Sequence, residues 1–245
     1  MSNSFFRFKQ FTVHQQNCAM KITTDACLFG AWTAMQLKQL PEKTKTILDI
    51  GTGTGLLSLM LIQKNQTHSI NAIEIDKNAA MQAATNFAAT PWKEKLNVIN
   101  ENVINFSFPK LFDFIICNPP FYENDLKSNN IKKNIAHHDE GLNLKNLFQI
   151  IKTNLSNDGT FCMLLPYKRD IEIHPIFHQY HFKIITKTYV RQSTKHDFFR
   201  ILIHGKIEND ADNREPIINE ISICDEEKLY TREFISLLKD YYLKL

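Results

Sequence analysis

Apolar and polar positions along the chain predict strands that alternate with helices. Short runs rich in β-branched and other apolar residues predict buried strands, and longer segments with apolar positions at helical spacing predict helices. The predicted strands cover residues 46–50, 69–75, 96–100, 112–117, 159–165, 182–191 and 198–207. The predicted helices cover residues 56–64, 77–89, 143–155 and 170–179. This alternation predicts an α/β fold with a doubly wound sheet.

We therefore expect a Rossmann-like, seven-stranded, mostly parallel sheet with helices on both faces, formed by residues 45–207 of one domain that spans 1–245. The last two predicted strands are expected to form an antiparallel hairpin at the sheet edge. Alternation between Phe5 and Val13 predicts a small amino-terminal hairpin. Residues 1–40 would supply this hairpin and a helix that complete the cofactor and substrate pocket, and 225–245 would form an amphipathic helix.

Composition places few limits on the function. The 245 residues carry a net charge of +3, which is mildly basic. No secretory leader and no apolar run of membrane-spanning length is evident, so we expect a cytoplasmic protein without a membrane partner. The cysteines show no C-x-x-C pair, and we expect reduced core residues and no metal site. They are Cys18, Cys27, Cys117, Cys162 and Cys224.

Four residues, Asn118, Pro119, Pro120 and Phe121, follow the predicted strand 112–117 directly. Ligands bind at the carboxyl ends of strands in open α/β sheets, so chemistry is expected here. The prolines hold the backbone extended and remove two amide donors, which leaves the Asn118 amide and the Pro119 carbonyl beside an aromatic ring. This pattern is typical of methyltransferases that act on planar amino groups, and we predict that all four residues are catalytic. The alternative is an ordinary turn, for which Asn-Pro is a common signal.

A glycine-rich turn follows the predicted strand 46–50. Gly51, Gly53 and Gly55 have the spacing G-x-G-x-G, in which the third glycine comes one residue earlier than in the dinucleotide fingerprint. No lysine follows, so the turn is not a phosphate-binding P-loop. Glu74 comes 23 residues after Gly51, in the next strand, where an acidic side chain can accept hydrogen bonds from both ribose hydroxyls.

Together with Asn-Pro-Pro-Phe, this spacing favours S-adenosyl-L-methionine as the cofactor and S-adenosyl-L-homocysteine as its product. A nicotinamide or flavin fold, or a plain βαβ unit, is the alternative. Asp49, near the end of the predicted strand 46–50 that precedes the turn, is a further candidate for cofactor binding. It could contact the methionine amino group through water or the loop backbone, or it could cap the following helix.

Basic residues are unevenly distributed. Lys127, Lys132 and Lys133 follow Asn-Pro-Pro-Phe, and acidic residues concentrate in 208–233. Cations near the proposed site would suit RNA phosphates, although solvated surface lysines are the plainer interpretation of any one of them. Further basic residues are Arg7, Lys9, Lys21, Lys168, Arg169, Lys183, Lys187, Arg191, Lys195 and Arg200.

Nearly the whole chain resembles the valine-tRNA adenine-N6 methyltransferase family, which modifies adenine 37 beside the anticodon. Three regions carry the resemblance beyond the generic fold: the amino end, Asn-Pro-Pro-Phe with the Ala-His-His that follows it, and the carboxyl end. The residues are Phe8 to Gln15, Ala19 to Lys21, Thr24, Asp25, Gly30 to Trp32, Asn118 to Phe121, Ala136 to His138, Tyr230 to Phe234 and Asp240 to Leu243. The resemblance implies cofactor binding by Thr24 and Asp25, RNA contact by His138, and a tRNA anticodon arm as the partner. It implies no obligatory protein partner.

The sequence departs from the family pattern at three places. Thr23 stands where the family usually has glycine, and His137 where it has arginine. Related enzymes often carry an aspartate after the third strand to accept from the cofactor adenine, and Glu101-Asn102 fills that place here. The Asn102 amide oxygen can still accept, but without charge assistance, so we expect weaker cofactor selectivity.

Other functions share these motifs. Asn-Pro-Pro-Phe also occurs in guanine-N2 methyltransferases of ribosomal RNA, and its tyrosine counterpart in protein glutamine-N5 methyltransferases. A methyltransferase-like fold that binds RNA without turnover is an alternative of a different class. A nicotinamide oxidoreductase is disfavoured by the glycine spacing and by the lack of a Tyr-x-x-x-Lys hydride site.

Overall fold

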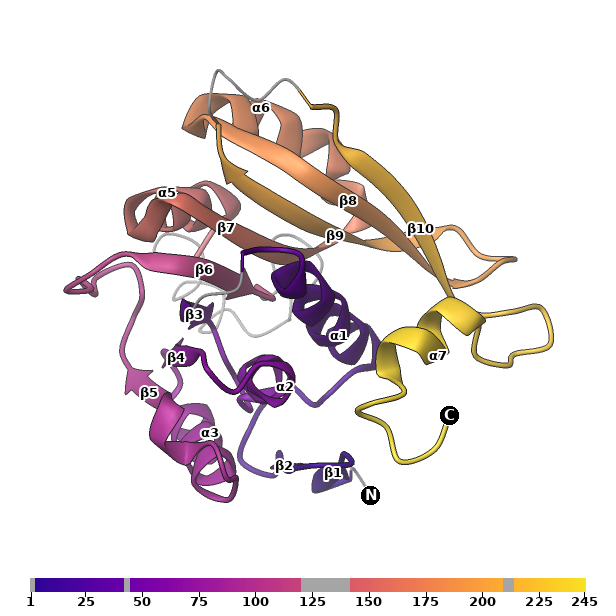
Figure 1. Cartoon of the computed structure of the whole chain (residues 1–245), viewed down its shortest axis with the longest axis horizontal. Coiled ribbons are helices and arrows are strands. Elements are labelled where there is room, and N and C mark those ends of the chain that lie inside the picture. Colours follow the sequence, from indigo (N-terminus) through magenta and orange to yellow (C-terminus); the bar gives the residue numbers. More distant parts are fainter. Residues whose placement is uncertain (1–2, 42–44, 120–141, 209–213) are drawn as a thin grey trace, which may run out of the picture.

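The computed structural model describes residues 3–41, 45–119, 142–208 and 214–245. Its centre is an eight-stranded sheet with the strand order β10-β8-β9-β7-β6-β3-β4-β5 (Figure 1). The strands are β3 (Thr46–Ile50), β4 (Ser69–Glu74), β5 (Leu96–Asn100), β6 (Phe112–Cys117), β7 (Leu155–Pro166), β8 (Phe182–Ser193), β9 (Phe198–Ile207) and β10 (Ile217–Cys224). Both pairs that include β9 are antiparallel and all other neighbouring pairs are parallel.

Helices cover both faces of this sheet (Figure 1). The helical segments are α1 (Thr24–Lys38), α2 (Leu56–Lys64), α3 (Lys77–Ala88), η1 (Lys93–Lys95), α5 (Leu144–Asn154), η2 (Tyr167–Arg169), α6 (Asp170–Tyr180) and α7 (Arg232–Leu238). Consecutive strand residues point to opposite faces, so Ile47 packs in the core with α1 and α2, and Leu48 packs with α5 and α6. Burial of both faces explains why the central strands are continuous apolar runs.

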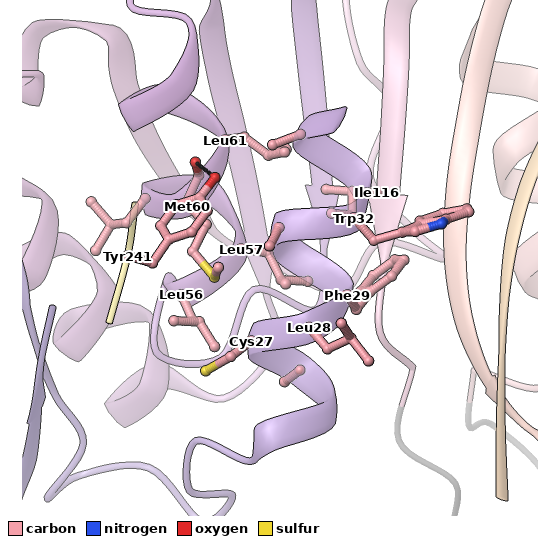
Figure 2. Close-up of a cluster of buried hydrophobic side chains, with 14 of the residues drawn as sticks. Cys27, Leu28, Phe29, Trp32, Leu56, Leu57, Met60, Leu61, Ile116 and Tyr241 are labelled. Atoms are coloured by element: carbon pink, nitrogen blue, oxygen red, sulfur yellow. Dashed lines mark hydrogen bonds between the residues drawn. The ribbon is translucent and has the colours of Figure 1, made fainter. Parts of the chain in front are cut away.

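The helices α1 and α2 approach each other closely at Gly30. A Cβ atom at Gly30 would lie 2.6 Å from the sulfur of Met60, so glycine is required for this spacing. Figure 2 shows Tyr241, from the carboxyl end of the chain, packed against the same cluster. The Tyr241 hydroxyl donates a hydrogen bond of 2.9 Å to the Met60 carbonyl. The end of the chain is thereby fixed to the helix that follows the glycine turn.

The predicted fold class is confirmed, and several elements have the predicted bounds. The strands at 46–50, 96–100, 112–117 and 198–207 and the helix at 56–64 coincide with β3, β5, β6, β9 and α2. The amino-terminal hairpin is also present, with β1 (Phe5–Arg7) antiparallel to β2 (Thr12–His14). The strand β7 begins at Leu155, directly after α5, four residues before the predicted start at 159.

The eighth strand, β10, was missed, and the predicted strand count of seven was wrong. β10 pairs in parallel with β8, so the β8–β9 hairpin is antiparallel as predicted but does not form the sheet edge. The first four residues of β10 are exposed, and only Ile221 and Ile223 are buried. An edge strand with few buried side chains gives a weak apolar pattern, and a short alternating run in an acidic segment carries little strand signal.

The predicted helix over 225–245 is wrong in its extent, because α7 covers only Arg232–Leu238. A turn precedes it, in which the Asp225 carboxylate accepts from the backbone N–H groups of Glu227 and Leu229. Lys228 in this turn has a φ of 67°, outside the helical region. Thr231 then begins the helix by accepting a hydrogen bond from the Phe234 N–H.

Candidate active site at the carboxyl edge of the sheet

The strand register brings the glycine turn beside Asn118. Ile50, the last residue of β3, is paired with Ile73 of β4 on one side and with Cys117, the last residue of β6, on the other. Gly51 and Asn118 therefore leave two adjacent strands at the same level. The Gly51 N–H also donates to the Ile73 carbonyl at 2.9 Å, which ties the turn to β4.

The three glycines of the turn have left-handed backbones, with φ of 69° at Gly51, 56° at Gly53 and 82° at Gly55. Their surroundings differ. A Cβ atom at Gly55 would lie 2.5 Å from the Phe87 ring, whereas one at Gly51 or Gly53 would meet no atom of the described residues within 4 Å. Gly55 is required by packing, and Gly51 and Gly53 leave open space where a ligand can approach the backbone.

Glu74, the last residue of β4, holds the turn directly. Its Oε2 accepts a hydrogen bond from the Gly53 N–H at 2.9 Å, and its Oε1 accepts from the Asp76 N–H at 2.9 Å. Each carboxylate oxygen has further lone pairs, so Glu74 can accept from ribose hydroxyls while it holds the turn. The predicted position beside the glycine turn is the one that the structure shows.

Asp49 is fully buried beneath the turn. Its Oδ2 accepts from the hydroxyls of Thr52 and Ser58, both at 2.7 Å. Burial raises the pKa of Asp49 to about 6, and the hydrogen bonds from Ser58 and Thr52 oppose that rise. Its other oxygen, Oδ1, has no hydrogen-bond partner within the described part of the chain. Asp49 thus fastens the turn through Thr52 and the first turn of α2 through Ser58, and Oδ1 is an open acceptor.

Asn118 presents a second open acceptor. Its Oδ1 is enclosed by protein, yet accepts no hydrogen bond from the residues that the structure describes. Pro119 beside it is buried. A buried amide oxygen without a partner carries a desolvation cost that a bound donor removes. Pro120 and Phe121, the other two predicted catalytic residues, lie outside the described residues.

The predicted cofactor residues Thr24 and Asp25 lie in the first turn of α1. Thr23, the residue that departs from the family pattern, caps this helix by accepting from the Ala26 N–H at 3.4 Å. The Asp25 Oδ2 accepts from Nε of Arg200 in β9 at 2.8 Å. Sequence reasoning did not connect Asp25 with Arg200, because 175 residues separate the two.

Asn102, after β5, uses its amide oxygen to form a turn. The Asn102 Oδ1 accepts from the Ile104 N–H at 3.0 Å. The second lone pair of that oxygen could accept from a ligand, as predicted for the cofactor adenine.

Asn86 of α3 is a residue of the site that sequence reasoning missed. It is fully buried, and its Nδ2 donates to the carbonyl of Thr54, inside the glycine turn, at 2.9 Å. The same amide exchanges hydrogen bonds with the backbone of His14 in β2. An asparagine on the inner face of a helix, where an apolar residue is expected, was the available signal.

The comparisons with known proteins agree with this geometry. The family model of the methyltransferase small domain matches residues 29–160. The tRNA1(Val) (adenine(37)-N6)-methyltransferase of Cytophaga hutchinsonii is 36% identical over 249 residues and covers 100% of both chains. The enzyme of the same name from Dyadobacter fermentans is 38% identical and covers 99% of this chain and 98% of its own. The chain belongs to the tRNA1(Val) (adenine(37)-N6)-methyltransferase family.

As a member of this tRNA-modifying family, the chain is a methyltransferase, and solved structures agree in fold. A predicted O-methyltransferase from Agrobacterium tumefaciens matches with a TM-score of 0.66 and 13% identity, over 88% of this chain and 95% of that one. A glycopeptide N-methyltransferase complexed with S-adenosyl-L-methionine matches with a TM-score of 0.53 and 11% identity, over 73% of this chain and 94% of that one. At these identities the likeness concerns the fold alone.

The residues predicted to contact RNA lie outside the described residues, as does His137. They are Lys127, Lys132, Lys133 and His138. Within the described ranges, no group of three His, Cys, Asp or Glu side chains is placed to hold a metal ion. None of the helices in those ranges has the length and apolarity needed to cross a membrane.

Proposed function

We propose that this family member methylates the N6 amino group of adenine 37 in the anticodon loop of a valine tRNA, with S-adenosyl-L-methionine as the methyl donor. The observation that carries the proposal is the buried Asn118 Oδ1 beside the glycine turn, which accepts no hydrogen bond from the described part of the chain. Two relatives, at 36% and 38% identity, are named for this activity and align with this chain over nearly their full length. They support the choice of substrate.

The residues of the turn fit the cofactor. Among the described residues, Gly51 and Gly53 leave open space at the backbone, Glu74 offers carboxylate lone pairs at the end of β4, and Asp49 Oδ1 is an acceptor without a partner. Glu74 would hold the ribose, and Asp49 would attract the methionine amino group through the turn or water. When bound, S-adenosyl-L-methionine supplies an electrophilic methyl group on a sulfonium and leaves as the neutral thioether.

Asn118 and Pro119 would activate the nucleophile. The exocyclic nitrogen of adenine is a weak nucleophile because its lone pair is delocalised into the ring. The Asn118 amide oxygen and the Pro119 carbonyl oxygen would each accept one amino hydrogen, which turns the nitrogen toward tetrahedral geometry and frees its lone pair. The nitrogen would form a bond to the methyl carbon while the bond from that carbon to the sulfonium sulfur breaks, and one amino proton would then leave to solvent. Catalysis would rest on positioning and electrostatics, without a strong base.

Phe121 would stack on the extruded base, as its place in Asn-Pro-Pro-Phe predicts. Base–aromatic stacking contributes roughly 1–3 kcal/mol per base. Extrusion from a loop costs less than extrusion from a duplex, and adenine 37 lies in a loop.

The test is methyl transfer from labelled S-adenosyl-L-methionine to total tRNA and, separately, to ribosomal RNA, followed by nucleoside analysis. We expect N6-methyladenosine in tRNA, with the rate reduced roughly 100-fold or more by Asn118→Ala, on the scale of lost transition-state hydrogen bonds, and with cofactor affinity retained. Asn97→Ala is the matched control, because Asn97 is an exposed asparagine on β5 whose amide donates a hydrogen bond to the Asn71 side chain of β4. Methylguanosine in ribosomal RNA would overturn the substrate, and full activity in Asn118→Ala would overturn the residue's role.

A further inference from the structure

Three aromatic rings from three elements meet at the carboxyl edge of the sheet. Tyr167 opens η2 directly after β7, Tyr189 lies in β8 and Phe198 begins β9. The ring centroid of Tyr167 lies 5.7 Å from that of Tyr189 and 5.7 Å from that of Phe198, and the latter two lie 5.3 Å apart. We call these three residues the aromatic platform.

The platform holds Tyr167 in place while leaving it accessible. Tyr167 is 40% exposed, whereas Tyr189 and Phe198 beneath it are half-buried. The Tyr189 hydroxyl donates to the Asp170 carboxylate at 2.9 Å, and burial, together with that carboxylate, raises the pKa of Tyr189 to about 12. A ring fixed by two others loses little conformational entropy when a planar ligand stacks on it.

The platform lies near the proposed site for the target adenine. Cys117, which precedes Asn118, is paired with Met163 of β7, so Asn118 is level with Leu164. Tyr167 is three residues farther along the chain, which corresponds to about 10 Å at the rise of a strand. This is about the height of three stacked nucleotides at ~3.4 Å each. The platform lies on the α6 side of the sheet, because Tyr189 packs against the core that includes α6.

Cations flank the platform but are already paired. The Arg191 guanidinium lies 5.2 Å from the centre of the Phe198 ring and is bonded to Glu220 at 3.2 Å. The ammonium of Lys187 lies 5.6 Å from the centre of the Tyr189 ring and is bonded to Asp170 at 2.6 Å. Because nearby carboxylates neutralise these charges, the platform is suited to stacking on bases more than to binding phosphates.

From these contacts we infer that Tyr167 is a stacking residue for an RNA base that flanks the methylated adenine. The inference rests on the proposed function, since it assigns a second contact to the same RNA. It adds η2, β8 and β9 to the proposed RNA interface, besides the residues already predicted from the sequence. A stacking contact predicts loss of affinity on removal of the ring, with little change in salt dependence.

The experiment measures the affinity of the full chain for a labelled anticodon stem-loop RNA at several salt concentrations. We expect Tyr167→Ala to weaken binding roughly 5- to 100-fold, the range for loss of one base–aromatic stack, with an unchanged slope of log affinity against log salt. Tyr167→Phe should bind like the parent chain, and Tyr167→Leu, which keeps apolar bulk without a ring, should not. Cofactor affinity should stay constant in all three variants.

Tyr180→Ala is the matched control. Tyr180 is half-buried at the end of α6, two residues before the start of β8 at Phe182, and hence at the opposite edge of the sheet. We expect this variant to bind RNA like the parent chain.

A protein–RNA double-mutant cycle then decides the inference. Bases flanking the target are replaced one at a time by abasic nucleotides, and each RNA is tested with the parent chain and with Tyr167→Ala. At one position the abasic RNA should weaken binding to the parent chain and not to Tyr167→Ala. The stacking role would be overturned if the affinity losses from the abasic nucleotide and from Tyr167→Ala were additive at every position. It would also be overturned if Tyr167→Ala changed the slope of log affinity against log salt. In both cases the parent chain would still methylate the RNA. Failure of the parent chain to bind or methylate the RNA would overturn the proposed function, and the inference with it.

Discussion

Asn86 and His14 exchange two hydrogen bonds across 72 residues of sequence. The Asn86 Oδ1 accepts from the His14 N–H at 3.0 Å, and the Asn86 Nδ2 donates to the His14 carbonyl at 2.9 Å. The same amide nitrogen donates to Thr54 of the glycine turn at 2.9 Å. One buried side chain therefore joins the amino-terminal hairpin, α3 and the turn proposed to bind the cofactor.

Asn86→Ala should lower both stability and cofactor affinity. Three backbone groups would lose their partner in a buried place, which we expect to cost roughly 2–4 kcal/mol in the free energy of unfolding. Urea denaturation measures this loss, and titration with S-adenosyl-L-methionine measures the affinity. Asn86→Asp should be no better, since a carboxylate cannot donate to the carbonyls of His14 and Thr54. If Asn86→Ala were as stable as the parent chain, the joining role would be wrong.

Gly53→Ala and Gly55→Ala should separate ligand approach from packing. Both substitutions force a side chain into a left-handed backbone, at a cost of about 1–2 kcal/mol. Gly55→Ala also drives a Cβ atom against the Phe87 ring, and should therefore lose roughly 1–3 kcal/mol more. At Gly53 the added Cβ atom meets no atom of the described residues within 4 Å, so the main effect of Gly53→Ala should be weaker cofactor binding. Thermal unfolding and cofactor titration of the two variants give the comparison, and equal stability losses would contradict it.

Asp49 should make the folded state less stable as the pH rises from about 4 to 6. The pKa of this carboxyl is raised to about 6 in the folded chain from an ordinary value of 3.8, so between these values only the unfolded chain has released the proton. The free energy of unfolding is therefore highest below the unfolded pKa and falls as the pH rises to the folded pKa, by at most roughly 3 kcal/mol. Asp49→Asn should remove this dependence, because an amide does not titrate in this range. Its oxygen can still accept hydrogen bonds from the hydroxyls of Thr52 and Ser58.

Urea unfolding of the parent chain and of Asp49→Asn at several pH values between 4 and 7 measures the difference. Burial lowers the pKa of His68 and of His204 to about 4, which contributes the opposite trend, stability lost as the pH falls. That contribution is common to both proteins and cancels in the difference. Parallel pH profiles of the two proteins would refute the role assigned to Asp49.

The ion pair of Asp25 with Arg200 should contribute measurable coupling between α1 and β9. The two side chains are 13% and 25% exposed, so we expect a coupling energy of about 1 kcal/mol, at the upper end for exposed pairs. The double-mutant cycle uses Asp25→Asn, Arg200→Gln and the double variant, with unfolding as the measurement. Zero coupling would show that the pair has no structural role. The same variants test the predicted cofactor contact, which requires Asp25→Asn, and not Arg200→Gln, to weaken cofactor binding.

The sequence by itself determined the central strands and the place of the glycine turn. The strands 46–50 and 112–117 are buried on both faces, so their character is local and appears as an apolar run. Turn glycines and residues at strand ends occupy fixed places relative to such runs. The sequence therefore located Gly53, Glu74 and Asn118 at one edge of the sheet.

Only the tertiary structure decided the partners of these residues. Asn86 reaches His14 across 72 residues and Arg200 reaches Asp25 across 175, and no local pattern encodes either contact. The same holds for β10, because no local pattern specifies its parallel pairing with β8. The aromatic platform depends on three chain segments that converge at one edge. Local periodicity indicates which residues of a segment are buried. The residues that they contact depend on the path of the whole chain.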